Sequence, residues 1–164
     1  MLISFEQLVK KTRPNVELPE RLLCLDPGET TGWCVFEHTS LVRWGQERTV
    51  SLEEIQWSTI RSLITDVRPT HIICEDYRIY AHKLARHTFS PVMTLRVIGG
   101  IECLAYFNGI PIYYQMASTA KGFVNDDKLK AWGFYQAGMR HSRDAIRHGC
   151  YFLLFYNRGG EFNE

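Results

Sequence analysis

Three acidic residues stand where an apolar segment ends or begins, the positions at which catalytic carboxylates are often found. Asp26 follows the apolar run Leu22–Leu25, Glu75 follows His71–Cys74, and Asp144 lies in the first turns of an apolar helical pattern. Active sites of open α/β sheets gather at the carboxyl ends of neighbouring strands. Asp26 and Glu75 would therefore meet if their strands were adjacent, and a helix packed across that end would add Asp144.

Three converging carboxylates repel one another and require a divalent cation, most naturally Mg²⁺ or Mn²⁺. Such a site hydrolyses phosphodiesters: one metal helps to generate the attacking hydroxide, and a second, about 3.5–4 Å away, stabilises the leaving oxygen. Each acid alone also has an ordinary explanation. An Asp before Pro-Gly is typical of a turn, a Glu at a strand end is usually solvated, and an Asp in the first turn of a helix complements the helix dipole.

The elements that would position these acids alternate between strands and helices. Short apolar runs bounded by turn residues predict five strands, over residues 22–25, 32–36, 41–49, 71–74 and 110–114. Helical spacing of apolar residues, with capping and stop signals, predicts helices over 5–10, 51–67, 92–107 and 141–155. Three strands in close succession predict an antiparallel meander, and the later strands, separated by helices, predict parallel pairing in a mixed α/β sheet.

Three local patterns resemble the motifs of RuvC-like Holliday junction resolvases, and they occur in that family's order. Residues 25–33, Leu-Asp-Pro-Gly-Glu-Thr-Thr-Gly-Trp, resemble the first motif, a strand ending in Asp-Pro-Gly and a Thr-Gly-aromatic strand start. Ile73-Cys74-Glu75 resembles the second, a hydrophobic strand closing on Glu. Residues 141–145, His-Ser-Arg-Asp-Ala, resemble the third, in which an acid or His is followed three residues later by Asp-Ala.

This resemblance implies a ribonuclease H-like fold over residues 21–158, with residues 1–20 as an N-terminal extension. It implies a mixed five-stranded sheet, three antiparallel strands and then parallel ones, flanked by helices. It also implies a homodimer that cleaves branched DNA, such as four-way junctions, with Mg²⁺ or Mn²⁺. By match of motif, Asp26, Glu75, Asp144 and His141 are the candidate catalytic residues and metal ligands. The short segment 125–138 is more like the compact versions known from bacteriophages.

Basic and aromatic residues near these motifs are candidate DNA contacts. Residues 77–101 contain no Asp or Glu, although the whole chain of 164 residues has a net charge of only +1. The predicted phosphate contacts are Arg78, Lys83, Arg86, Lys121, Arg140 and Arg143. Family members often carry an aromatic wedge after the second acid, and Tyr77 and Tyr80 are candidates for it. Ordinary solvated surface charges are the alternative explanation.

The remaining features place limits on the protein class. The five cysteines are scattered without a Cys-x-x-Cys pair, which argues against a zinc site or disulfide framework and favours buried reduced thiols. With no apolar run long enough to span a bilayer and no signal-peptide pattern, we expect a cytoplasmic protein without a membrane partner, in the host cytoplasm if it is viral.

The helix 92–107 is apolar nearly all round, so it is either the dimer interface or a core helix. A less selective nuclease and a non-catalytic nucleic-acid-binding protein of the same fold are the alternative functions.

Overall fold

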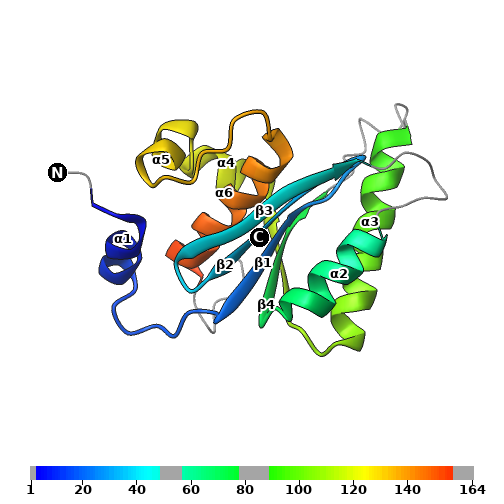
Figure 1. Cartoon of the computed structure of the whole chain (residues 1–164), viewed down its shortest axis with the longest axis horizontal. Helices are drawn as coiled ribbons and strands as arrows, with labels where there is room; N and C mark the ends of the chain where they lie inside the picture. Colours follow the sequence, from blue (N-terminus) through cyan, green and yellow to red (C-terminus); the bar gives the residue numbers. More distant parts are fainter. Residues whose placement is uncertain (1–2, 49–56, 78–88, 157–164) are drawn as a thin grey trace.

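The computed structural model describes residues 3–48, 57–77 and 89–156. A central sheet is flanked by helices on both faces (Figure 1). Its strands are β1 (Arg21–Asp26), β2 (Thr30–Glu37), β3 (Ser40–Arg48), β4 (His71–Asp76) and β5 (Ile112–Met116). The helices in the described residues are α1 (Phe5–Thr12), α2 (Trp57–Val67), α3 (Phe89–Phe107), α4 (Ala117–Phe123), α5 (Asp126–Ala131) and α6 (Arg140–Phe155).

The sheet topology confirms the predicted mixed α/β architecture. The spatial order of the strands is β3-β2-β1-β4-β5. β1 pairs with β2 and β2 with β3 in antiparallel fashion, whereas β1 pairs with β4 and β4 with β5 in parallel. β1 and β4 are therefore direct neighbours running the same way, and their carboxyl ends, with Asp26 and Glu75, lie at one edge of the sheet.

Side-chain alternation divides the core into two layers. In β1, Leu22 and Cys24 face a cluster that includes α6, whereas Leu23 and Leu25 face a cluster that includes α2 and α3. A strand buried on both faces reads as a continuous apolar run, which is why β1 was predictable. Side chains alternate along a strand, so Asp26 shares the α6 face with Leu22 and Cys24.

Several boundaries differ from the predicted ones. β5 begins at Ile112 instead of Ile110, because Pro111 lacks an amide hydrogen for the ladder and the pairing with β4 starts at Ile112. α2 is described from Trp57, and the predicted start at Ser51 lies outside the described residues. Among the cysteines, which all have free thiols, Cys103 is exposed instead of buried, and the other four are buried as expected.

α1 packs against the carboxyl-terminal part of α6 and belongs to the same hydrophobic cluster. Ser4 caps it, with its side chain accepting from the Gln7 amide and the Gln7 side chain accepting from the Ser4 amide. Phe5 and Val9 are buried, and the Phe5 ring contacts those of Trp132 and Phe134. Residues 5–12 therefore share the core of the domain. No helix within the described ranges is long and apolar enough to cross a membrane.

Candidate active site

Strand register brings Asp26 and Glu75 to the same face of the same sheet edge. In β4, Ile73 faces the α6 layer and Cys74 faces the α3 layer, so Glu75 returns to the α6 layer, as Asp26 does at the end of β1. Asp76, the next residue, falls on the opposite face by the same alternation. Asp26 is 6% exposed, which is unusual for a carboxylate at a strand end and shows that it is not an ordinary solvated turn residue.

α6 lies across this edge because β2 carries a glycine beneath its first turn. A Cβ atom added at Gly32 would stand 2.0 Å from the backbone carbonyl group of His141, so only glycine permits this approach. The close contact turns His141 and Asp144 toward the carboxyl end of β1. The Thr-Gly-aromatic start of β2 thus has a physical reason: it is the surface on which the amino-terminal turn of α6 rests.

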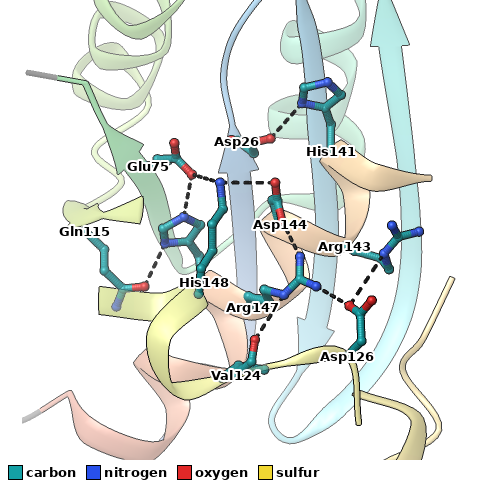
Figure 2. A network of polar contacts seen from close by, with 11 residues as sticks. Asp26, Glu75, Gln115, Val124, Asp126, His141, Arg143, Asp144, Arg147 and His148 are labelled. Atoms are coloured by element: carbon teal, nitrogen blue, oxygen red, sulfur yellow. Dashed lines mark hydrogen bonds and ion pairs between the residues drawn. The ribbon is translucent and has the colours of Figure 1, made fainter. Parts of the chain in front are cut away.

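The four predicted catalytic side chains meet in one cleft, joined in part by a lysine (Figure 2). His141 Nδ1 lies 2.9 Å from Asp26 Oδ2. Lys121, on α4, lies with its Nζ 3.3 Å from Glu75 Oε2 and 3.1 Å from Asp144 Oδ2. Three carboxylates from β1, β4 and α6 therefore surround a small volume in which their negative charge is concentrated.

The protonation equilibria of the two strand-end acids are pushed apart. Burial, opposed by the hydrogen bond with His141 and reinforced by the charge of Glu75, raises the pKa of Asp26 to about 6. Burial also disfavours ionised Glu75, but the hydrogen bond and attraction from His148, together with Lys121, outweigh it and lower the pKa of Glu75 to about 2. The hydrogen bond with Asp26 raises the pKa of His141 above its usual value. Neighbouring acids with such different pKa values are typical of active sites.

The donor set suits a hard divalent cation, since three carboxylates offer the oxygen ligands that Mg²⁺ and Mn²⁺ prefer. Within the described residues, no three His, Cys, Asp or Glu side chains already stand close enough together to enclose a metal ion. The carboxylate oxygens are instead held by cationic or hydrogen-bonding neighbours, above all Lys121. Lys121 balances part of the carboxylate charge, and the chemistry of the donor set is what makes the cluster a candidate metal site.

A second layer of polar side chains holds these carboxylates from behind. Arg147 hydrogen-bonds to Asp144 and to Asp126, and its Nε donates to the Val124 carbonyl oxygen at 3.0 Å. His148 lies 2.8 Å from Glu75 through its Nε2 atom (Figure 2). The available signal was spacing: Arg147 and His148 follow Asp144 by three and four residues, so both can reach back along the same face of α6.

The structure separates the predicted DNA contacts into three groups. Lys121 and Arg140 line the cleft, as does Tyr77, one of the two predicted wedge residues. Arg143 does not face the cleft opening: its side chain is 15% exposed, and its Nη1 donates to the Gln136 carbonyl oxygen at 2.6 Å. The phosphate contact predicted for Arg143 stays a prediction, and in the structure this side chain contacts the segment before α6. The other predicted contacts, Arg78, Tyr80, Lys83 and Arg86, lie outside the described residues.

The cleft has further residues that the sequence did not single out. Glu29 and Arg48, on either side of the β2 and β3 hairpin opening, line it, and Arg48 Nη2 lies 3.3 Å from Glu29 Oε1. Thr94, near the start of α3, lines it from the opposite layer. The cleft therefore collects residues from most of the elements that end at this edge of the sheet.

Comparison with known proteins gives a likeness in structure without one in sequence. No protein-family profile and no curated protein matches the sequence. Thermus thermophilus RuvC in complex with a Holliday junction substrate aligns with a TM-score of 0.65 at 16% identity, covering 82% of this chain and 92% of that one. The yeast mitochondrial Holliday junction resolvase Ydc2 aligns with a TM-score of 0.53 at 15% identity, covering 91% of this chain and 84% of that one.

The fowlpox virus Holliday junction resolvase aligns with a TM-score of 0.52 at 10% identity, covering 81% of this chain and 97% of that one. At these identities the likeness shows the fold, and most of each compared chain is matched. The chain has the ribonuclease H-like fold in the form found in RuvC and other Holliday junction resolvases.

Proposed function

We propose that this protein is a structure-selective endonuclease that cuts four-way or otherwise branched DNA by divalent-metal-assisted phosphodiester hydrolysis. The observation that carries the proposal is the convergence of Asp26, Glu75 and Asp144 beside Lys121 at one sheet edge. A protein that only bound nucleic acid would gain nothing from acids gathered next to phosphates. The resolvases that share the fold supply the substrate class.

In this proposal Asp26, Glu75 and Asp144 hold Mg²⁺ or Mn²⁺, with His141 as a further candidate ligand. The bound metal would supply Lewis-acid activation of water and stabilisation of the leaving oxygen. His141, hydrogen-bonded to Asp26 and half-buried, is placed to accept or return a proton during hydrolysis. Lys121 provides a positive charge next to the carboxylates, where it would stabilise negative charge that develops on the scissile phosphate.

Cations at the cleft are proposed to hold the DNA backbone. Lys121 and Arg140 line the cleft. Arg78, Lys83 and Arg86 follow Glu75 in the chain and remain predicted contacts, with Tyr77 and Tyr80 as predicted wedge residues. Phosphate contacts release counterions, so binding should weaken steeply as the salt concentration rises.

α3 is the proposed dimer interface. Its inner face, with Met93, Val97, Ile101 and Ala105, is buried in the core. Its outer side carries exposed apolar residues: Val92 is 46% exposed, Leu95 41%, Tyr106 82% and Phe107 77%. The core explanation describes the inner face, and the exposed apolar residues of the outer face support the proposed interface. An isologous dimer through the outer face would match the approximate two-fold symmetry of a four-way junction.

A cleavage assay with four-way, flap and linear DNA, with and without Mg²⁺ or Mn²⁺, tests this function. We expect paired, symmetric incisions in the four-way junction only when the metal is present. Flap DNA cut as readily as the junction would indicate the less selective nuclease. Binding without cleavage of any substrate, at any metal concentration, would contradict the proposal.

A further inference from the structure

A chain of buried hydrogen bonds runs beneath Glu75, away from the cleft. His148, on α6, is 0% exposed, and Gln115, on β5, is 3% exposed. His148 Nε2 lies 2.8 Å from Glu75 Oε2, and His148 Nδ1 lies 2.7 Å from Gln115 Oε1 (Figure 2). The imidazole ring thus bridges a side chain at the candidate metal site and a buried side chain on β5.

Three elements are locked together by this bridge. Glu75 and Gln115 are direct partners in the parallel pairing of β4 and β5, so both side chains point toward α6. His148 comes one turn after Asp144 on α6, which places it opposite both. A single helix therefore carries one acid of the site and, through the next turn, contacts a second acid from β4.

The buried polar groups of this bridge lower the stability of the fold relative to apolar groups, so stability alone does not explain them. Burying hydrogen-bonding groups stabilises a fold less than burying apolar groups of the same shape, and a leucine would fill the same space. Gln115 Nε2 is buried without a hydrogen-bond partner among the described residues. The Glu75 carboxylate only accepts, so His148 donates to it from Nε2. With the Gln115 amide turned so that its Nε2 donates to Nδ1, a neutral imidazole makes both hydrogen bonds, whereas Oε1 facing Nδ1 requires an imidazolium that donates from both ring nitrogens. The constant feature is therefore a donor aimed at the Glu75 carboxylate.

We propose that His148, oriented by Gln115, is a positioning residue for Glu75. It fixes the carboxylate rotamer through Oε2, so that Glu75 stands ready beside Asp26 and Asp144 instead of rotating freely. The inference rests on the proposed function, since it assigns a role toward the same metal site. Partners that orient a metal ligand from behind typically change metal affinity or activity by about 10- to 100-fold when they are removed.

The test is a Mn²⁺ titration of the whole, metal-free protein by calorimetry, without DNA. We expect His148→Leu to weaken Mn²⁺ binding by about 10- to 100-fold and Gln115→Leu to weaken it less. His148→Gln keeps an N–H donor at a similar distance from the backbone, and it should recover most of the affinity. His71→Leu is the matched control, because His71 lies at the opposite end of β4 and should leave Mn²⁺ affinity unchanged.

A double-mutant cycle with Glu75→Gln shows whether His148 acts through Glu75. The effect of His148→Leu on Mn²⁺ affinity should disappear in the Glu75→Gln background. In cleavage assays, His148→Leu should lower kcat while the KM for junction DNA stays within about threefold, because the metal site and not the DNA surface is disturbed.

Three results would overturn the proposal. The first is an unchanged Mn²⁺ affinity in folded His148→Leu or Gln115→Leu protein, and the second is an equal loss of Mn²⁺ affinity in His148→Leu and His148→Gln. The third is that His148→Leu weakens Mn²⁺ binding as much in the Glu75→Gln background as in the wild type. If His148→Leu fails to fold, Gln115→Leu and His148→Gln decide the question. Wild-type protein that binds Mn²⁺ but cuts no DNA would contradict the proposed function, and the titrations would still decide the role of His148. Wild-type protein that binds no Mn²⁺ would overturn both.

Discussion

At the scale of single residues, the site depends on two features that act against ordinary protein stability. Asp26 is a buried carboxyl group with Glu75 beside it, and burial holds its pKa at about 6. Gly32 has no side chain, and this lets the backbone of α6 at His141 pack directly against β2. Both features serve the same arrangement, in which three carboxylates meet at the carboxyl ends of β1 and β4.

The raised pKa of Asp26 predicts how stability depends on pH when no metal is bound. The folded protein keeps a proton on Asp26 that the unfolded chain has lost, so the contribution of Asp26 to wild-type stability falls as the pH rises from about 4 to about 6. Asp26→Asn cannot ionise and escapes this loss. In chelator at pH 7.5 we expect the variant to be more stable by about 1–3 kcal/mol, with the difference vanishing near pH 4.

Thermal or urea unfolding at the two pH values measures this difference. Added Mn²⁺ should raise the stability of the wild type and have little effect on the variant, because a ligand stabilises only the state that binds it. A variant that is less stable than wild type at pH 7.5 in chelator would show that the Asp26 carboxylate is favoured by its surroundings.

Gly32→Ala should displace the first turn of α6. The added methyl group would meet backbone atoms of His141 and Ser142, which cannot move without moving the helix. We expect a loss of about 3 kcal/mol or more in unfolding free energy and loss of cleavage activity in whatever protein remains folded. Gly122→Ala is the matched control, since a Cβ there meets no atom within 4 Å and Ala is the better helix former. Near-wild-type stability of Gly32→Ala would be inconsistent with the close contact.

At the scale of elements, what the sequence could predict depends on where the determining interactions lie. β1 and β4 were predictable because they are short, apolar on both faces and followed by acids. Bounds for α4 and α5 were not predicted, because helices of 7 and 6 residues show little periodicity. They are tied down by distant partners such as Arg147, which bonds to the Val124 carbonyl group.

The same reasoning explains which site residues were found. Motif order identified Asp26, Glu75, His141 and Asp144, all of which line the cleft. A periodic pattern cannot distinguish an arginine that points to solvent from one that points inward, so the contact of Arg143 with the Gln136 carbonyl oxygen was not predicted. The contacts of His148 could not be predicted from local spacing, because its partners Glu75 and Gln115 are 73 and 33 residues away.

The contact of Arg13, the residue after α1, with α6 predicts a loss of stability when Arg13 is replaced. Arg13, 7% exposed, donates from Nη1 to the Leu153 carbonyl oxygen at 2.9 Å and lies near the Phe152 carbonyl. It gives the Leu153 carbonyl group, in the last turn of α6, a side-chain donor, whereas the Phe152 carbonyl group also accepts from the Tyr156 amide. Arg13→Met should lower the unfolding free energy by about 1.5–3 kcal/mol, measured by chemical denaturation.

Lys10→Met provides the comparison on the same helix. Lys10 is exposed and pairs with Glu6, an interaction of a kind that contributes little. Its replacement should change stability by less than about 0.5 kcal/mol. Equal effects of the two substitutions would mean that Arg13 does not secure the end of α6.

At the scale of the whole molecule, the cleft and the outer face of α3 share one helix, because Thr94, near the start of α3, lines the cleft. Tyr106 and Phe107 are exposed near the other end of this helix. A dimer formed through α3 would hold two clefts at a fixed separation, as paired incisions require. Leu95→Glu should therefore shift the protein toward monomer in sedimentation experiments and convert paired incisions into single nicks.

Val42→Glu is the control for this prediction. Val42 is 40% exposed on β3, an edge strand of the sheet, so its exposure matches that of Leu95 while its location differs. It should leave the dimer intact. Wild-type protein that sediments as a monomer at working concentration and still makes paired cuts would refute the dimer.

The most direct measurement is cleavage of a labelled four-way junction in Mg²⁺ or Mn²⁺ by Glu75→Gln and Asp26→Asn, with junction binding measured on the same samples. Removing either carboxylate takes away a proposed metal ligand and also a negative charge that repels phosphates. We predict that cleavage falls by more than about 10²-fold while binding persists or tightens, and that Asp127→Asn, at a 90% exposed side chain, is unchanged. Full metal-dependent cleavage by either site variant would contradict the assignment of these carboxylates as the catalytic centre.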